Sequence, residues 1–234
     1  MSLKNKTILI SGGNSGLGFE ISKQLIRLGS KVIILGKNQN NLNLAVKKLK
    51  SPFASSMVCD LTNAEEIEKL NIGKLDILIN CAGVIKYSPL EKHSITDIKN
   101  IIDTNLIGTI LLTRQVLPIL KKQNSGIIVN ISSTSGLMTG GHAYESVYIA
   151  SKFGVTGFTE SLKKEMAEEG KNIKVLGFYP GGMNTPLFTK SGEDKDTTNF
   201  MDPAEIAKIL VFMLQQPDAV SMDHIVVNRN KTAK

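Results

Sequence analysis

Short apolar runs alternate along the chain with longer segments in which apolar residues recur every three or four positions. The first run spans residues 6–11, and the segment 19–28 behind it has the apolar spacing of an amphipathic helix. A repeated order of buried strand and helix is typical of an α/β protein with a doubly wound parallel sheet of Rossmann type, with helices on both faces. The apolar runs predict seven strands, at 6–11, 31–36, 57–60, 75–80, 126–131, 173–179 and 224–228.

The segments between these runs have helical periodicity. In the long stretch 95–122, Gly108 and Pro118 predict interruptions. The polar stretch 187–199 predicts a loop. The other helices are predicted at 19–28, 41–50, about 64–70, 148–169 and 203–214.

The chain contains no internal repeat and no linker that would divide it. Its 234 residues are enough to bury a substantial core. We therefore expect one domain over 1–234.

A glycine-rich turn, G-G-N-S-G-L-G at 12–18, joins the first predicted strand to the first helix. Glycines let the backbone approach a pyrophosphate closely, and the free N–H groups of a helix N-terminus attract the anion. The spacing is G-x-x-x-G-x-G rather than the commoner G-x-G-x-x-G. Its position predicts a dinucleotide phosphate site, and the alternative is an ordinary tight turn.

Tyr148 and Lys152 are four residues apart in a predicted helix, which places them on one face, a turn apart. A phenol normally loses its proton near pH ~10, and a nearby ammonium favours the phenolate and lowers that pKa. We expect such a pair to exchange a proton with an alcohol or carbonyl near neutral pH. The alternative is an ordinary helix face, because this pair also arises by chance.

The net charge of +7 comes from 25 lysines and three arginines set against 21 acidic residues. The lysines are scattered in ones and twos, and arginine, the residue favoured for phosphate and base contacts, is scarce. We expect solvated surface charge and no nucleic-acid partner, with an acidic ligand as the alternative.

The sequence predicts neither a membrane-spanning helix nor a metal site. The most apolar helical segment, 105–113, is too short to span a bilayer, so we expect no membrane partner. The three histidines lack the spacing of metal ligands, so we expect no metal site. Cys59 and Cys81, in a chain without secretory features, favour free thiols and a cytoplasmic location.

Taken together and in order, these motifs give the chain a family resemblance. It resembles the short-chain dehydrogenases/reductases, in their single-domain branch, over nearly its whole length. The motifs that carry the resemblance are S-G-G-N-S-G-L-G at 11–18, Asp60 after the third strand, N-C-A-G at 80–83, Asn105, I-S-S at 131–133, Y-x-x-x-K at 148–152 and P-G-G at 180–182.

The resemblance implies an enzyme that transfers a hydride between a nicotinamide and a carbonyl or secondary-alcohol substrate. The single domain over 1–234 would combine dinucleotide binding and catalysis, with a substrate loop at about 183–201. It implies that Tyr148 is the general acid/base and that Ser133 hydrogen-bonds the substrate oxygen. Lys152 would bind the nicotinamide ribose and lower the pKa of Tyr148, and Asn105 would hold a water that links Lys152 to solvent. Ser133 is chosen over Ser132 by its place in I-S-S.

The resemblance also implies a set of cofactor contacts. The glycine turn would pass under the pyrophosphate, and Asp60 would accept a hydrogen bond from the adenine amino group, although a strand-end cap is the alternative. Asn80 would brace the sheet, with Ala82 and Gly83 beside the adenine ribose. The expected cofactor-binding residues are Gly12, Asn14, Ser15, Gly16, Leu17, Gly18, Lys37, Asp60, Leu61, Asn80, Ala82, Gly83, Tyr148, Lys152, Pro180, Gly181 and Thr185.

The end of the second strand predicts which dinucleotide is bound. An acidic residue there binds the ribose hydroxyls and repels a 2′-phosphate, whereas a basic residue pairs with that phosphate. Gly36 stands where the acid is expected, and Lys37 follows it. We expect NADP(H) to be favoured, with NAD(H) as the alternative.

Two further expectations concern the class of protein and its assembly. A non-catalytic, dinucleotide-binding regulator of the same fold is the alternative to an enzyme, but such a regulator is expected to lose Tyr148, Lys152 or Ser133. The helices at 105–120 and 148–169 are apolar over more of their circumference than one sheet-facing stripe needs. We expect a homodimer or homotetramer packed through them.

Overall fold

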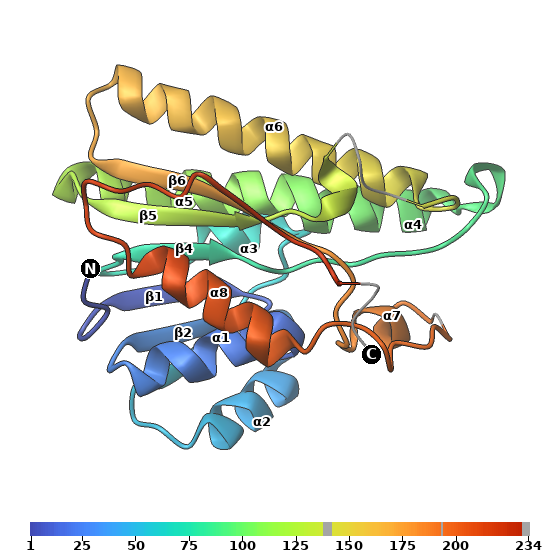
Figure 1. Ribbon diagram of the computed structural model, residues 1–234, viewed down its shortest axis with the longest axis horizontal. Helices are drawn as coiled ribbons and strands as arrows, with labels where there is room; N and C mark the ends of the chain where they lie inside the picture. Colours follow the sequence, from blue (N-terminus) through green and yellow to red (C-terminus); the bar gives the residue numbers. More distant parts are fainter. Residues whose placement is uncertain (138–141, 193, 231–234) are drawn as a thin grey trace.

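The computed structural model describes residues 1–137, 142–192 and 194–230, and a sheet of parallel strands runs through its centre (Figure 1). The seven strands lie in the order β3-β2-β1-β4-β5-β6-β7. The order in which successive strands are added reverses between β1 and β4, which is the switch point of a doubly wound fold. The predicted Rossmann-type sheet is confirmed. The strands are β1 (Thr7–Ser11), β2 (Lys31–Gly36), β3 (Ala54–Val58), β4 (Ile77–Asn80), β5 (Gly126–Ile131), β6 (Ile173–Pro180) and β7 (His224–Val227).

Helices cover both faces of the sheet. In Figure 1, α1, α2 and α8 lie on one face, and α4, α5 and α6 lie on the other. The α-helices are α1 (Gly16–Arg27), α2 (Gln39–Leu49), α3 (Ala64–Glu68), α4 (Ile95–Ile102), α5 (Gly108–Gln123), α6 (Ser146–Glu168), α7 (Leu187–Lys190) and α8 (Pro203–Leu214). Single turns of 3₁₀-helix are η1 (Leu90–Lys92) and η3 (Thr134–Gly136), and a π-helical turn, η2 (Asp103–Ile107), connects α4 to α5.

The third strand lies earlier in the sequence than its apolar pattern predicts. The prediction of 57–60 was wrong, because β3 spans Ala54–Val58 and pairs in parallel with β2, Gly36 beside Val58. β3 is an edge strand, covered less than the central strands, so it needs few apolar residues and carries a weak apolar signal. Asp60 consequently lies two residues beyond the strand.

The prediction also differed from the structure in two helical regions. Pro118 does not interrupt α5 but lies inside it, and the break in the stretch 95–122 is the π-helical turn η2. Within the predicted loop 187–199, the first residues form the short helix α7, beyond the carboxyl ends of the strands (Figure 1).

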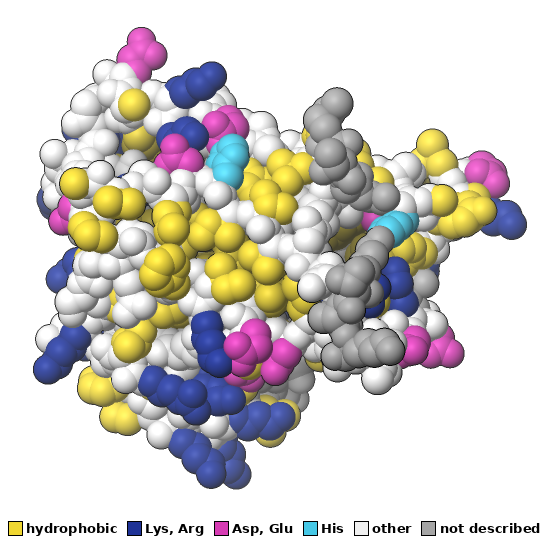
Figure 2. All heavy atoms as spheres, viewed as in Figure 1, with side chains coloured by type: hydrophobic (Ala, Val, Ile, Leu, Met, Phe, Trp, Pro, Cys, Tyr) yellow, Lys and Arg dark blue, Asp and Glu magenta, His cyan; other side chains and the backbone are white. Residues whose placement is uncertain are grey.

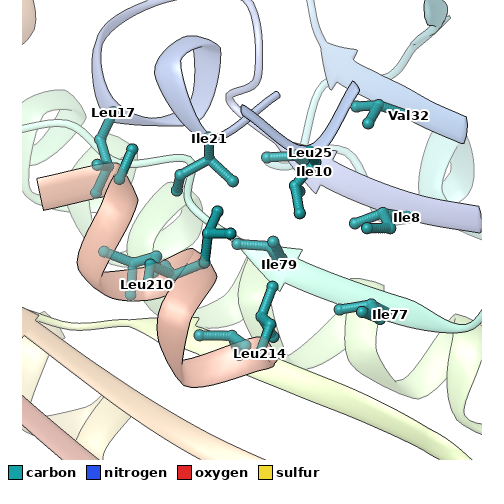
Figure 3. Close-up of a cluster of buried hydrophobic side chains, with 14 of the residues drawn as sticks. Ile8, Ile10, Leu17, Ile21, Leu25, Val32, Ile77, Ile79, Leu210 and Leu214 are labelled. Atoms are coloured by element: carbon teal, nitrogen blue, oxygen red, sulfur yellow. The ribbon is translucent and has the colours of Figure 1, made fainter. Parts of the chain in front are cut away.

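Two apolar clusters, one on each face, hold the helices to the sheet. On one face, Leu17, Ile21 and Leu25 of α1 and Leu210 of α8 pack against the sheet, as Figure 3 shows. On the other face, α3, α5 and α6 pack against the alternate residues of the same strands. Because both faces are covered, the central strands are apolar at nearly every position, which explains the continuous runs in the sequence.

A chain of buried polar side chains crosses the second face. Asn80 at the end of β4 donates to the hydroxyl of Thr113 in α5 (2.9 Å) and to the side-chain carbonyl of Asn130 in β5 (2.8 Å). Asn130 in turn donates to the hydroxyl of Thr159 in α6 (2.9 Å). These bonds tie both helices to the sheet near the carboxyl ends of its strands.

The surface carries both charge and exposed apolar side chains. Figure 2 shows hydrophobic side chains across the middle of one face, where α8 and β7 lie. Phe212 of α8 and Val226 of β7 are 54% and 49% exposed. None of the helices described is long and apolar enough to cross a membrane. Within the described ranges, no cluster of His, Cys, Asp or Glu is suited to hold a metal ion.

Candidate active site

The glycine turn connects β1 to α1 and forms one wall of a cleft at the carboxyl ends of the strands. Gly12 has a φ of +68°, and a Cβ there would lie 2.8 Å from the Ala82 Cα. A Cβ at Gly18 would lie 2.5 Å from the Gly12 carbonyl oxygen, so both positions require glycine. The N-cap Ser15 makes no side-chain hydrogen bond to the first turn of α1, which leaves the helix N–H groups available to an anion.

The cleft has a volume of about 780 Å³ and extends from the end of β2, across the glycine turn, to the first turn of α6. This volume lies within the roughly 300–1,000 Å³ typical of ligand and cofactor sites. The residues present fit a dinucleotide, because an uncapped helix N-terminus and side-chain-free glycines lie in the middle of the cleft. The expected cofactor residues that line it are Gly12, Asn14, Ser15, Gly16, Leu17, Gly18, Lys37, Asp60, Leu61, Ala82, Gly83, Tyr148, Lys152, Pro180, Gly181 and Thr185.

Two expected site residues do not line the cleft. Asn80 is 97% buried between the sheet and α5, where it forms the polar chain described above, so it braces the sheet but does not contact the cleft. Asn105 lies in the π-helical turn η2 behind the cleft wall. Such turns are frequent at functional sites.

Tyr148 lies in the first turn of α6 and packs against Ile85 and Phe188. It is only 8% exposed to solvent. Burial raises the pKa of Tyr148 to about 12, and the negative charge of Glu145 adds to this, while a hydrogen bond with Ser133 opposes it. The expected lowering of this pKa by Lys152 is therefore wrong for this structure. The reason is that desolvation of the phenolate outweighs the favourable hydrogen bond.

Lys152 lies one turn further along α6. Its ammonium is 5.8 Å from the centre of the Tyr148 ring and donates a 2.9 Å hydrogen bond to the carbonyl of Ile131, at the end of β5. Burial lowers the pKa of Lys152 to about 8. At neutral pH the side chain remains mostly charged, in a site that disfavours that charge.

Ser132 and Ser133 point in different directions. The Ser132 hydroxyl donates to the Lys152 carbonyl at 2.9 Å, so it faces the backbone of α6. Ser133 makes the hydrogen bond with Tyr148 and lines the cleft beside it. The residue chosen from the sequence is thus the one that contacts the tyrosine.

Asn105 is held by three hydrogen bonds to neighbouring segments. Its side-chain oxygen accepts from the Val84 amide (2.8 Å), and its Nδ2 donates to the Val84 carbonyl (2.9 Å) and the Ser151 hydroxyl (3.0 Å). A Cβ at Gly83 would lie 3.4 Å from the Asn105 side-chain oxygen and 3.7 Å from the Lys152 Nζ. Asn105 therefore joins the segment after β4 to α6 directly behind the tyrosine and the lysine.

The other end of the cleft is formed by Lys37 and Asp60. The Lys37 ammonium lies 3.9 Å from the Asp60 carboxylate and is 68% exposed. The Asp60 carboxylate also accepts hydrogen bonds from the amide and the hydroxyl of Thr62, at 3.0 and 2.9 Å. No carboxylate stands at the end of β2 itself, where Gly36 lies.

Several cleft residues carry no signal in the sequence. Lys190 of α7 donates a 2.8 Å hydrogen bond to the Ser15 hydroxyl, beside the glycine turn, although 175 positions separate the two. Lys195 donates at 2.9 Å to the phenol oxygen of Tyr87, and both lie near the apolar wall over Tyr148. These contacts depend on how the 183–201 segment folds back over the cleft, which local sequence patterns do not predict.

The fold and this cleft define a dinucleotide-binding protein with a buried tyrosine at the inner end of its site. Comparison with known proteins agrees: residues 6–196 match the short chain dehydrogenase family. An uncharacterised oxidoreductase of Staphylococcus saprophyticus is 32% identical over 237 residues, which cover 97% of this chain and 98% of the relative.

Two solved structures have similar folds. A serine dehydrogenase complexed with NADP⁺ superposes with a TM-score of 0.86 at 28% identity and covers 94% of both chains. An actinorhodin polyketide ketoreductase with NADPH superposes with a TM-score of 0.84 at 27% identity and covers 96% of both chains. The chain belongs to the short chain dehydrogenase family. It is an oxidoreductase that uses a nicotinamide dinucleotide.

Proposed function

We propose that this enzyme interconverts a small carbonyl compound and its alcohol, with Tyr148 as the general acid/base. The observation that supports this most directly is that Tyr148, Ser133 and Lys152 meet at one end of a cleft whose middle is the glycine turn. When bound, the dinucleotide supplies or accepts the hydride.

Tyr148 holds the proton that the reaction needs. With a pKa of about 12, the phenol is protonated at neutral pH, which suits a donor to the oxygen of a carbonyl being reduced. In the opposite direction, the phenolate form of Tyr148 accepts the proton of the alcohol and returns to the phenol. Ser133, hydrogen-bonded to the phenol, binds the same substrate oxygen and holds it in line with Tyr148.

Lys152 supplies positive charge behind the tyrosine. Its ammonium is fixed by the Ile131 carbonyl and stabilises negative charge that develops on the phenol and on the substrate oxygen. Lys152 would also hold the ribose next to the nicotinamide when a dinucleotide is bound. Asn105 fixes the wall at Val84 and Ser151 and holds the water that connects Lys152 to solvent.

The preferred dinucleotide is NADP(H), through Lys37. Its ammonium is largely exposed at the end of β2 and within reach of a 2′-phosphate. Gly36 removes the carboxylate that would repel such a phosphate. NAD(H) remains the second candidate, because the 3.9 Å contact with Asp60 already engages Lys37.

We further propose that the chain acts as one catalytic unit over 1–234, in the cytoplasm, and assembles as a homodimer or homotetramer through the helices at 105–120 and 148–169, which are η2 with α5, and α6. Not every apolar residue of α5 can contact a partner subunit. Leu112 and Val116 are buried in the core of the chain. Ile107 and Phe153 are 40% and 38% exposed on this side, so they are available to a partner subunit. No nucleic-acid partner is proposed.

The test of the proposed mechanism is Tyr148→Phe. We expect turnover of carbonyl compounds to fall by a factor of about 100 or more, because proton transfer by a positioned group contributes roughly 10²–10⁴-fold. Dinucleotide affinity, measured by fluorescence titration, should change little. Tyr144→Phe is the matched control, since Tyr144 is 61% exposed and outside the cleft.

Full activity of Tyr148→Phe would refute the mechanism. A wild-type protein that binds dinucleotide tightly but reduces none of a panel of aldehydes, ketones and oxo acids would favour the second candidate, a non-catalytic dinucleotide-binding regulator. The intact set of Tyr148, Ser133 and Lys152 supports the enzyme.

A further inference from the structure

Three aromatic rings and a lysine form a wall over Tyr148 that the reaction scheme above does not use. Tyr87 and Phe188 stack with ring centres 6.1 Å apart, and Phe188 meets Phe200 edge to face at 5.7 Å. We name Tyr87, Phe188 and Phe200 the aromatic wall. Phe188 also packs on Tyr148, so the wall begins at the reacting end of the cleft.

The ammonium of Lys195 lies against all three rings. It is 4.3 Å from the centre of the Tyr87 ring, 5.0 Å from that of Phe188 and 5.8 Å from that of Phe200. The rings attract the cation and hold it at a defined position, and the Tyr87 hydroxyl accepts one of its hydrogens. Lys195 is thus ordered by the wall before any ligand arrives.

This cation has unused binding capacity. An ammonium has three hydrogen-bond donors, and Tyr87 takes one of them. In the part of the chain that the structure describes, Lys195 pairs with no carboxylate. A second cation, Arg229, lies on the same wall, with its guanidinium carbon 5.8 Å from the centre of the Phe200 ring. Both side chains line the cleft, so two cations stand along this part of its wall.

We propose that the substrate carries a carboxylate and that Lys195 binds it while the reacting carbonyl or hydroxyl lies at Tyr148. The inference rests on the proposed function and names its substrate class: short oxo acids and hydroxy acids. Ile85 and Phe188 lie beside Tyr148, so they contact the hydrocarbon segment between the two polar ends. An ordered ammonium with two donors that the described residues leave unbonded matches a carboxylate monoanion better than a phosphate dianion, which needs more donors.

A purely structural role for Lys195 is the competing explanation. The residue joins the 183–201 segment to Tyr87, so its loss could loosen the cleft for every substrate alike. A substrate-binding role differs in that it affects charged substrates selectively. The experiment therefore compares each acid with its own neutral ester.

The assay measures kcat/KM for short oxo acids with the carbonyl at position 2, 3 or 4, and for their methyl esters. We expect the wild type to prefer at least one acid over its ester by about 10- to 100-fold, the effect of a charge-assisted hydrogen bond. Lys195→Met should remove this preference and leave ester turnover within about threefold of wild type, because it lacks only the charged donor. Lys195→Arg, which keeps the charge, should retain most of the preference. Lys122→Met is the matched control, since Lys122 lies in the last turn of α5, outside the cleft.

Two results would overturn the carboxylate site: a wild type that prefers no acid over its ester, or a Lys195→Met variant that loses acid and ester turnover equally. A wild type that reduces neutral aldehydes or ketones but none of these compounds also overturns the carboxylate site. If the wild type reduces no carbonyl compound at all, the proposed function fails instead. The site is then judged by binding alone, with acid and ester titrated against the fluorescence of enzyme-bound NADPH. Tighter binding of the acid that Lys195→Met abolishes supports the site, and equal binding of both refutes it.

Discussion

Replacing Lys152 by methionine is expected to change how the stability of the protein depends on pH. Lys152 is 95% buried, and burial lowers its pKa from 10.5 to about 8. Methionine has a similar length and no charge. The pH-dependent part of the stability difference between the two proteins therefore comes from the titration of Lys152.

The sign and size of the effect follow from the two pKa values. Between pH 8 and 10.5 the unfolded chain binds more protons at this site than the folded chain, so the wild type becomes more stable as pH rises. This contribution is complete above the unfolded pKa and is lost as pH falls through the folded pKa. From pH 7 to pH 10 the wild type should gain about 2–3 kcal/mol relative to Lys152→Met, at 1.36 kcal/mol per pKa unit.

The measurement is urea unfolding of both proteins at pH 7, 8, 9 and 10, without dinucleotide. The difference in free energy of unfolding is plotted against pH, which cancels the titration of groups that the two proteins share. Cys81, which lies near Lys152, does not disturb this comparison, because burial raises the pKa of its thiol to about 12. If the free energies of unfolding of the two proteins change with pH in parallel, burial does not disfavour the charged form of Lys152, and the reasoning is wrong.

Two other predictions concern the cofactor and the assembly. Lys37→Ala should weaken NADPH binding by about 5- to 10-fold and leave NADH binding unchanged, because one exposed phosphate contact is lost; Lys47→Ala, on the exposed side of α2, is the control. Equal weakening of both dinucleotides, or a wild type that prefers NADH, would contradict the assignment of Lys37. Light scattering at micromolar concentration should give two or four times the chain mass of 25.4 kDa, and a monomer would refute the proposed assembly.

The sheet could be predicted from the sequence because its central strands are covered on both faces. Ile8, Ile34 and Ile79 lie in such strands and are fully buried, so their apolar runs mark the strands directly. The edge strand β3 lacks this double cover, and its polar sequence A-S-S-M-V hides its start. Local patterns thus report burial, and they fail where burial is partial.

The candidate site divides in the same way. Tyr148 and Lys152 are neighbours on one helix, so their spacing shows in the sequence. The contact of Lys195 with Tyr87 joins residues 108 positions apart, and no local pattern encodes it. The direction of the Tyr148 pKa was also inaccessible, because it depends on how deeply Ile85 and Phe188 bury the ring.

The buried bond between Asn130 and Thr159 has a mechanical consequence for the chemistry. Apolar packing resists the separation of a helix from a sheet but offers little resistance to sliding along its axis, whereas a hydrogen bond at 2.9 Å tolerates almost no displacement. Thr159 lies seven residues after Lys152, about 10 Å along the helix at 1.5 Å per residue. Together with the hydrogen bond from Ser132 to the Lys152 carbonyl, the bond between Asn130 and Thr159 therefore resists movement of α6 along its own axis. Asn130 thus helps to set how far the ammonium and the phenol reach into the cleft, without contacting either.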